Sequence, residues 1–269
     1  MSYQSFPELE VKKDNYSLWI TLNRPDFSNA FTTEMIEQLV GTLYQADEDN
    51  DVRTIIITGA GKHFCAGGDV KSMQTKTGMF AGESNELRER YKRGIQKIPV
   101  CFYSLSTPTI AMINGAAIGA GLDLACMCDI RLCSDQAKFG ETFVKLGLIP
   151  GDGGTYFLQR VIGFAKAMEL SLTGDIIDGV QAKNIGLVNQ LIGAEELQKE
   201  TLKYAEKINN NAPIAVQMVK RGLTHAYHND LFSNLDLLSA YQGITQRTSD
   251  HANAVSHVFD KSQADFKHL

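Results

Sequence analysis

The chain has 269 residues, of which 43% are hydrophobic and 21% are charged, with a formal net charge of −5. This length and composition are typical of a globular protein with a large core. The acidic balance argues against a nucleic-acid-binding protein, which usually carries a basic excess.

The five cysteines show neither CxxC pairing nor zinc-like spacing with histidine. We therefore expect reduced, core-filling thiols and no metal site. The first residues lack the pattern of a signal peptide, and no apolar run reaches the length of a membrane span. These features predict a cytoplasmic protein without a membrane partner.

Strands and helices are predicted to alternate in the first half of the chain. Residues 16–25 alternate as a strand does and stop at Pro25, and residues 32–49 have helical spacing with Thr32 or Thr33 as the cap. The predicted elements that follow are a strand over 52–61, a mobile polar loop over 71–85, a helix over 86–105 kinked near Pro99, and a buried strand over 107–117. This order predicts an α/β fold.

The pattern changes after Gly163, where helical segments dominate. They cover residues 165–174, 178–186, 194–211, 213–228, 230–248 and 251–266. We therefore expect an α/β core over residues 1–197 and a helical C-terminal region over residues 198–269.

Two glycine clusters each follow a predicted strand and open a predicted helix, at residues 61–70 and 114–123. Glycine permits close backbone approach, and the first amides of a helix are free to face an anion. Neither cluster has the spacing of a Walker-type loop or of a dinucleotide fingerprint. Together they predict an oxyanion hole with one N–H donor from each cluster.

The chain resembles the crotonase (enoyl-CoA hydratase/isomerase) superfamily over nearly its whole length. The resemblance rests on "LNRPDFSNAF", "IIITGAGKHFCAGGD", "INGAAIGAGLDLACMCDIR", "AKFGETFVKLGLIPGDGGT" and "AMELSLTGDIIDGVQAKNIGLVNQL", which follow one another at family-like spacing. It implies a spiral of β-β-α units with a C-terminal helical trimerisation region, assembled as a trimer or hexamer. It also implies an acyl-CoA thioester substrate, with coenzyme A as part of the substrate and no separate cofactor.

The same resemblance assigns individual residues. Gly68 and Ala120 correspond to the two amide donors of the oxyanion hole. Phe266 and Lys267 correspond to residues that reach the CoA of a neighbouring subunit. The residues expected to contact the substrate are Ser28, Ala30, Ala66, Gly68, Asp69, Val70, Lys71, Phe143 and Lys267.

The acid–base residues depart from the family pattern. Hydratases of this family use two glutamates, whereas ungapped alignment places Asp123 and Phe143 at those positions. Asp123 lies in an apolar stretch, where desolvation raises a carboxyl pKa, and it is the best single candidate for proton transfer. Its structural alternative is a helix cap or a salt bridge.

Two further carboxylates are candidates. Glu141 precedes the expected position by two residues, so it reaches the same place only if this segment is extended or rearranged. Its alternative is an ion pair with Lys138, Lys145 or Arg160. Asp152 is the fallback, and its alternative is an N-cap of the following helix.

These observations lead to three functional hypotheses. The first is an enoyl-CoA hydratase acting on a 2-enoyl-CoA, with Asp123 as the essential acid–base residue and Glu141 as its partner. The second is an enoyl- or dienoyl-CoA isomerase that uses the same carboxylates as proton carriers. The third is a non-catalytic acyl-CoA-binding paralogue. The length of the acyl chain is not encoded in any pattern that we identify.

Overall fold

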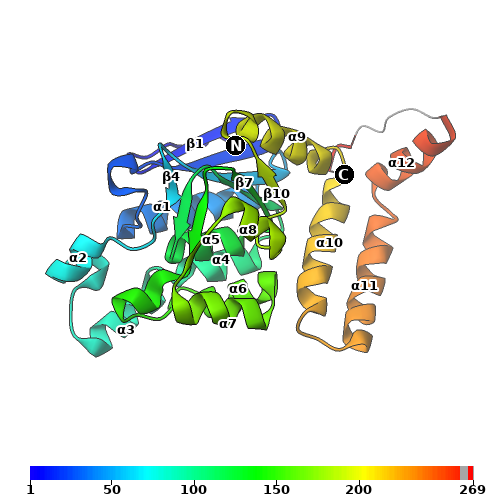
Figure 1. Cartoon of the computed structure of the whole chain (residues 1–269). Helices are drawn as coiled ribbons and strands as arrows, with labels where there is room; N and C mark the ends of the chain where they lie inside the picture. Colours follow the sequence, from blue (N-terminus) through cyan, green and yellow to red (C-terminus); the bar gives the residue numbers. More distant parts are fainter. Residues whose placement is uncertain (261–265, 269) are drawn as a thin grey trace.

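Two β-sheets form the centre of the computed structural model, which describes residues 1–260 and 266–268 (Figure 1). Within these residues the larger sheet has the strand order β1-β2-β3-β5-β7-β10 and the smaller sheet has the order β4-β6-β8-β9. The larger sheet comprises β1 (Leu9–Asp14), β2 (Ser17–Leu22), β3 (Thr54–Gly59), β5 (Thr109–Ile113), β7 (Ile130–Ser134) and β10 (Gln190–Ile192). The smaller sheet comprises β4 (His63–Cys65), β6 (Ala116–Ile118), β8 (Lys138–Gly140) and β9 (Ile176–Asp178).

Successive strands enter the two sheets in turn. β3, β5 and β7 lie parallel in the larger sheet, and β4, β6 and β8, which follow them directly in the chain, lie parallel in the smaller one. β1 and β9 pair antiparallel with β2 and β8. Since helices follow each pair of strands, the predicted spiral of β-β-α units is confirmed.

The helices surround these sheets and extend beyond them. They are α1 (Thr33–Asp47), α2 (Val70–Thr75), α3 (Ser84–Arg93), α4 (Lys97–Ser104), α5 (Ala120–Met127), α6 (Gly154–Ile162), α7 (Phe164–Thr173), α8 (Gly179–Asn184), α9 (Leu197–Asn209), α10 (Pro213–Ala226), α11 (Leu231–Thr245) and α12 (Ser249–Asp260). No helix in the described part of the chain is long and apolar enough to cross a lipid bilayer.

Helix boundaries follow local chemistry. The Thr32 hydroxyl accepts a hydrogen bond from the amide of Met35 at 3.0 Å, so Thr32 is the cap of α1. The predicted helix over 86–105 is instead two helices, and the break lies at Gly94 rather than at Pro99. Pro99 is accommodated because it lies in the first turn of α4, where a missing N–H breaks no helical hydrogen bond.

The segment predicted as a loop over residues 71–85 contains regular structure. Asp69 caps α2 by accepting hydrogen bonds from the amides of Lys71 and Ser72 at 3.0 and 3.1 Å. A 3-10 turn follows at Gly78–Phe80. The prediction failed because the segment is polar and short, whereas a capped single turn needs only one well-placed carboxylate.

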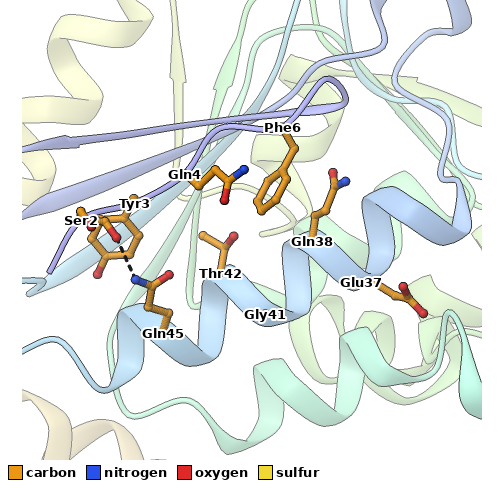
Figure 2. A pocket seen from close by; sticks show the side chains of 9 residues that line it. All are labelled: Ser2, Tyr3, Gln4, Phe6, Glu37, Gln38, Gly41, Thr42 and Gln45. Atoms are coloured by element: carbon orange, nitrogen blue, oxygen red, sulfur yellow. Dashed lines mark hydrogen bonds between the residues drawn. The ribbon is translucent and has the colours of Figure 1, made fainter.

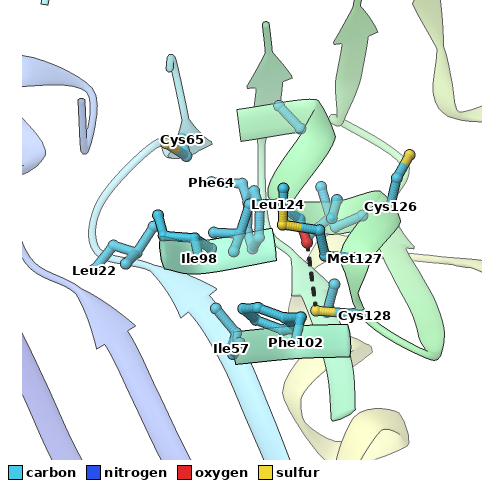
Figure 3. Packing of buried hydrophobic residues seen from close by; sticks show 14 of the residues in the cluster. Leu22, Ile57, Phe64, Cys65, Ile98, Phe102, Leu124, Cys126, Met127 and Cys128 are labelled. Atoms are coloured by element: carbon cyan, nitrogen blue, oxygen red, sulfur yellow. Dashed lines mark hydrogen bonds between the residues drawn. The ribbon is translucent and has the colours of Figure 1, made fainter. Parts of the chain in front are cut away.

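The main core lies where α4 and α5 pack against the sheets (Figure 3). Side chains from both sheets and both helices meet there, including Leu22, Ile57, Phe64, Ile98, Phe102, Leu124 and Met127. Every residue of α5 is buried. The five cysteines are also buried and free, as predicted. A polar side chain on α5 is therefore held in apolar surroundings.

The C-terminal helices divide into two parts. α9 packs on the larger sheet, where Leu197 and Ala205 join Trp19, Ile56 and Ile110 in a second apolar cluster. α10 and α11 lie side by side and extend away from the sheets together with α12 (Figure 1). The proposed boundary at residue 197 coincides with the start of α9, and an independent region from 198 onward remains a prediction.

Candidate active site

The two predicted glycine-rich loops meet at one point. Gly67 has a φ angle of +83°, and a Cβ atom on it would lie 2.8 Å from the carbonyl oxygen of Ile118 and 3.0 Å from the amide nitrogen of Ala120. Only glycine therefore lets the loop after β4 lie against the start of α5. The amides of Gly68 and Ala120 have no acceptor among the described residues, and both residues line the same cavity.

The walls of this cavity are mainly apolar. Its lining residues are Gly68, Met73, Met79, Phe80, Tyr91, Ile95, Ala120, Phe143, Leu148 and Asp152. Asp152 and Tyr91 are the ionisable side chains among them. The free volume is about 20 Å³, enough for one water molecule. An acyl chain enters only if flexible side chains such as Met73 and Phe80 move.

Asp123 lies on α5, one turn after Ala120, and its side chain is fully buried. Neither of its carboxyl oxygens accepts a hydrogen bond from a backbone amide or from a side chain other than a neighbouring carboxyl group among the described residues, and it forms no salt bridge there. The structural alternatives of a helix cap or a salt bridge are therefore wrong. Burial, followed by the charges of Asp152 and Glu141, raises the pKa of Asp123 well above its usual range.

Glu141 is fully buried at the end of β8, before a 3-10 turn at Thr142–Leu146. Its backbone, with φ −90° and ψ 65°, is neither helical nor extended, and a 3-10 turn follows it, so this segment is rearranged rather than extended. Both carboxyl oxygens lack partners in the described structure, so the alternative of an ion pair is wrong. Burial and then the charge of Asp152 raise the pKa of Glu141 to about 8.

Phe143 and Asp152 both face the cavity. The Phe143 ring lies 3.6 Å from the position that a Cβ atom on Gly119 would take, so it forms an apolar wall beside α5. Asp152 is 3% exposed, and the N-cap of α6 is Gly153, without a side-chain cap. The capping alternative for Asp152 is therefore wrong. Burial raises the pKa of Asp152, and a hydrogen bond with Asp123 partly offsets that rise.

The three carboxyl groups form one cluster around the start of α6. A Cβ atom on Gly154 would lie 2.3 and 2.5 Å from the two carboxyl oxygens of Asp123 and 2.5 Å from Oε1 of Glu141. Within the described structure, Asp123 can form a hydrogen bond only when its carboxyl group is protonated. It then donates that proton to a carboxyl oxygen of Asp152 or Glu141. The cluster therefore holds Asp152 at the cavity wall, with Asp123 and Glu141 behind it.

The other predicted contact residues fall into two places. Ser28, Ala30 and Ala66 lie beside the cavity loop, where the Ala66 amide donates to the carbonyl of Ser28 at 2.9 Å. Asp69 is occupied as the cap of α2, while Val70 and Lys71 are exposed at the start of that helix.

Lys267 lies in a different part of the molecule. Its amide and that of His268 donate to the carboxyl group of Asp250 at 2.8 and 3.0 Å, and Arg53 donates to the carbonyl of Phe266 at 2.5 Å. The described C-terminal residues thus fold back on their own chain. Contact of Lys267 with a neighbour's CoA remains a prediction.

Sequence reasoning missed part of the site. Tyr91 and Ile95 come from α3 and its C-terminal end, Met73 from α2, and Gly154 from the start of α6. No motif marks these positions, because they become neighbours only through the packing of α2, α3 and the start of α6 around the site. The glycine pair at 153–154 is evident in the sequence, but its role depends on contact with Asp123, which is far away in the chain and adjacent in the fold.

A second hollow lies between the N-terminal residues and α1 (Figure 2). Neutral side chains such as Gln4, Gln38, Thr42 and Gln45 line it, with Glu37 as its carboxylate. Its single carboxylate, Glu37, is exposed, and none of the buried carboxyl groups and none of the glycine-rich loops described above line it. We therefore place the candidate active site at the first cavity.

Comparisons with known proteins agree over the whole length of the chain. The sequence model of a family described as enoyl-CoA hydratase/isomerase matches residues 13–268. A probable enoyl-CoA hydratase of Mycobacterium bovis is 33% identical over 268 residues, and a peroxisomal Delta(3,5)-Delta(2,4)-dienoyl-CoA isomerase of Arabidopsis thaliana is 32% identical over 278 residues; in both pairs each chain is fully covered. The crystal structure of an enoyl-CoA hydratase from Bacillus anthracis is 31% identical with a TM-score of 0.91, covering 97% of this chain and 100% of that one. The likeness thus holds in sequence and in fold.

Proposed function

The chain belongs to the enoyl-CoA hydratase/isomerase family, and from that premise we propose that it adds water to the double bond of a 2-enoyl-CoA thioester. It is an acyl-CoA-processing enzyme of the hydratase/isomerase type. The observation that carries the finer proposal is the meeting of two unpaired amides, Gly68 and Ala120, with the Asp152 carboxyl group in one cavity.

The two amides supply the electrostatic part of the reaction. When water adds to C3 of the acyl chain, the electrons of the double bond move toward C2 and the thioester oxygen becomes an enolate oxygen. Hydrogen bonds from Gly68 and Ala120 stabilise this charge in a site from which bulk water is excluded. Loss of one such donor typically costs about 100-fold or more in rate.

The carboxylate cluster supplies the proton transfer. Asp152 lines the cavity, so it is the group that takes a proton from water and returns one to C2. Asp123, whose pKa is raised well above its usual range by burial, keeps a proton and shares it with Asp152. This assignment reverses the order expected from the sequence, in which Asp123 came first and Asp152 last.

Isomerisation is the second candidate. One carboxyl group lines a mainly apolar cavity, which suits removal of a proton from one carbon and its return to another. The non-catalytic alternative receives no such support, because a binding protein gains nothing from three carboxyl groups buried against one another without a cationic partner among the described residues.

The reaction product separates the two candidates. We expect conversion of a 2-enoyl-CoA in water labelled with heavy oxygen to give a 3-hydroxyacyl-CoA whose mass includes the label. A product of unchanged mass with a shifted double bond supports isomerisation. Absence of turnover on short, medium and branched 2-enoyl and 3-enoyl thioesters contradicts both.

Assembly is part of the proposal. On α11 the side chains of Leu231, Leu235 and Leu238 are 65%, 49% and 37% exposed. Adjacent exposed leucines of this kind form an apolar patch, which is typical of a protein–protein interface. We expect this face to be covered in a trimer or hexamer, with a mass three or six times the 29.6 kDa of one chain. Light scattering at micromolar concentration that gives the monomer mass contradicts this. A cytoplasmic location and the lack of a separate cofactor remain predictions.

A further inference from the structure

Tyr91 and Asp152 face the same small cavity from opposite elements. Tyr91 comes from α3 and Asp152 from the loop before α6. The remaining wall consists of aliphatic, thioether and phenyl side chains together with the two glycine-loop residues. The Tyr91 hydroxyl has no hydrogen-bond partner among the described residues, although the residue is only partly exposed.

The position of Tyr91 relative to Asp152 is fixed through Gly151. A Cβ atom on Gly151 would lie 3.0 Å from Cε1 of the Tyr91 ring, so the ring rests on the residue next to Asp152. The side-chain amide of Gln96 donates to the carbonyl of Gly151 at 2.8 Å, which ties this loop to the start of α4. The Tyr91 ring and the Asp152 carboxyl group are thus positioned relative to each other by the backbone at residues 151–152, against which the ring packs.

The state of the hydroxyl follows from its surroundings. Burial, and then the charge of Asp152, raises the pKa of Tyr91 above its usual value, so the hydroxyl remains a donor at neutral pH. The hydroxyl still reaches solvent in the structure, and a donor that loses its water on ligand binding and finds no acceptor is destabilised. A bound ligand that fills this cavity with hydrocarbon alone imposes this destabilisation, whereas an oxygen atom beside the hydroxyl removes it.

We propose that Tyr91 is a further catalytic residue, whose hydroxyl binds the reacting water opposite Asp152. The proposal rests on the hydration proposed above. Tyr91 donates to the water oxygen while Asp152 accepts one water proton. The oxygen then bonds to C3, and the π electrons pass to the thioester oxygen as the enolate. Asp152 returns the proton to C2, so water is added without any other reactant.

This arrangement also accounts for the phenyl ring at position 143. With Phe143 in the cavity wall, no second carboxylate reaches the water from that side. The cavity has room for one water molecule, and Tyr91 is the second polar side chain that lines it. The second polar group of the site is thus the Tyr91 hydroxyl on α3, and not a side chain of the loop after β8.

The test compares Tyr91→Phe with the parent enzyme in two reactions. The first is incorporation of heavy oxygen from labelled water into a 2-enoyl-CoA. The second is exchange of the C2 hydrogens of a saturated acyl-CoA with deuterium from solvent, which needs the amides and Asp152 but no bound water. We expect the hydration kcat of Tyr91→Phe to fall about ten- to 100-fold, with exchange changed less than about threefold.

Two more variants sharpen the test. Gly151→Ala keeps the hydroxyl but pushes the ring, so we expect a smaller loss of hydration that is not additive with Tyr91→Phe. Tyr16→Phe is the matched control, since it removes a tyrosine hydroxyl that lies far from the cavity beside Arg53, and its activity should be unchanged.

The possible failures are distinguishable. Equal label incorporation by the parent and Tyr91→Phe overturns the role of Tyr91 and leaves the proposed hydration intact. Equal loss of hydration and exchange assigns Tyr91 a structural role and also overturns the proposal. No label incorporation by the parent enzyme overturns the hydration itself, and the role of Tyr91 with it. A pH profile of kcat that keeps its midpoints in Tyr91→Phe supports direct contact with water.

Discussion

Gly154 faces Asp123 so closely that a Cβ atom at position 154 would lie 2.3 Å from Oδ1 of the aspartate. The carboxylate cluster therefore exists only because α6 begins with a residue that has no side chain. The carboxylate cluster thus depends on glycine at position 154 as much as on Asp123, Glu141 and Asp152 themselves.

The first prediction is that Gly154→Ala reduces kcat at least about 100-fold, because the new methyl group separates Asp123 from its neighbours. Steady-state kinetics and thermal unfolding should be measured together. The matched control is Gly41→Ala in α1, where a Cβ atom has no neighbour within 4 Å. That change should leave kcat unaltered and stabilise the helix by about 1 kcal/mol. Full activity in Gly154→Ala contradicts the role of the cluster.

The second prediction ranks the carboxyl groups. Asp152→Asn should cost about 100-fold to 10,000-fold in kcat, because it removes the group that reaches the cavity. Asp123→Asn keeps a hydrogen-bond donor behind Asp152 and should cost less, and Glu141→Gln should cost least. Far-ultraviolet circular dichroism checks that the variants are folded. A greater loss in Asp123→Asn than in Asp152→Asn restores the order predicted from the sequence.

The third prediction concerns the pH dependence of kcat. Activity should rise with pH as Asp152 ionises, since its pKa is raised by burial. It should fall again near pH 8, because burial raises the pKa of Glu141 to about 8 and its ionisation places a second negative charge beside Asp152 and the enolate. In Glu141→Gln the alkaline limb should move to higher pH. An unchanged alkaline limb in this variant rejects Glu141 as its source.

The fourth prediction concerns the pH dependence of stability. The folded protein binds the Glu141 proton more tightly than the unfolded chain does, because burial raises the pKa of Glu141 to about 8 from an ordinary value of 4.5. The free energy of unfolding should therefore fall as pH rises between these values. Glu141→Gln removes this contribution, so its Tm relative to the parent should be higher at pH 9 than at pH 6, by at least about 2 °C. An equal difference at both pH values contradicts it.

The fifth prediction tests the backbone donor at Ala120. Proline at this position removes the N–H, yet it is the first residue of α5, where proline is tolerated in helices. We expect Ala120→Pro to lower kcat about 100-fold or more with a smaller effect on folding. Thr33→Pro, at the first position of α1 behind the extended residue Thr32, is the matched control and should retain activity. Equal activity of the two variants argues against an amide donor at Ala120.

The sequence predicted the parts of the fold that depend on local patterns. Buried strands such as β3 follow from their β-branched runs, and the start of α1 follows from Thr32. The break between α3 and α4 was misplaced because a proline in the first turn of a helix has little effect, whereas the backbone at Gly94 does leave the helical range.

The candidate site was predicted less completely, for a physical reason. Asp123, Glu141 and Asp152 were all identified from the sequence. Their alternative roles as helix caps or ion pairs could be rejected only from their burial and their hydrogen-bond partners in the structure. Which carboxyl group faces the cavity depends on how α6 starts relative to α5. Tyr91 lies 61 residues before Asp152 in the chain, and no spacing rule connects them.

The hydrogen bond from Arg53 to the carbonyl of Phe266 joins residues 213 positions apart in sequence. During synthesis, Arg53 leaves the ribosome long before its acceptor has been made. Arg53 directly precedes β3, which pairs with β2 and β5, so the bond joins the end of the described chain to the central sheet. Closing a loop of such length costs conformational entropy that the contacts of the folded state must offset. Residues 266–268 are thus fastened to the core by this bond and by the two amides that donate to Asp250.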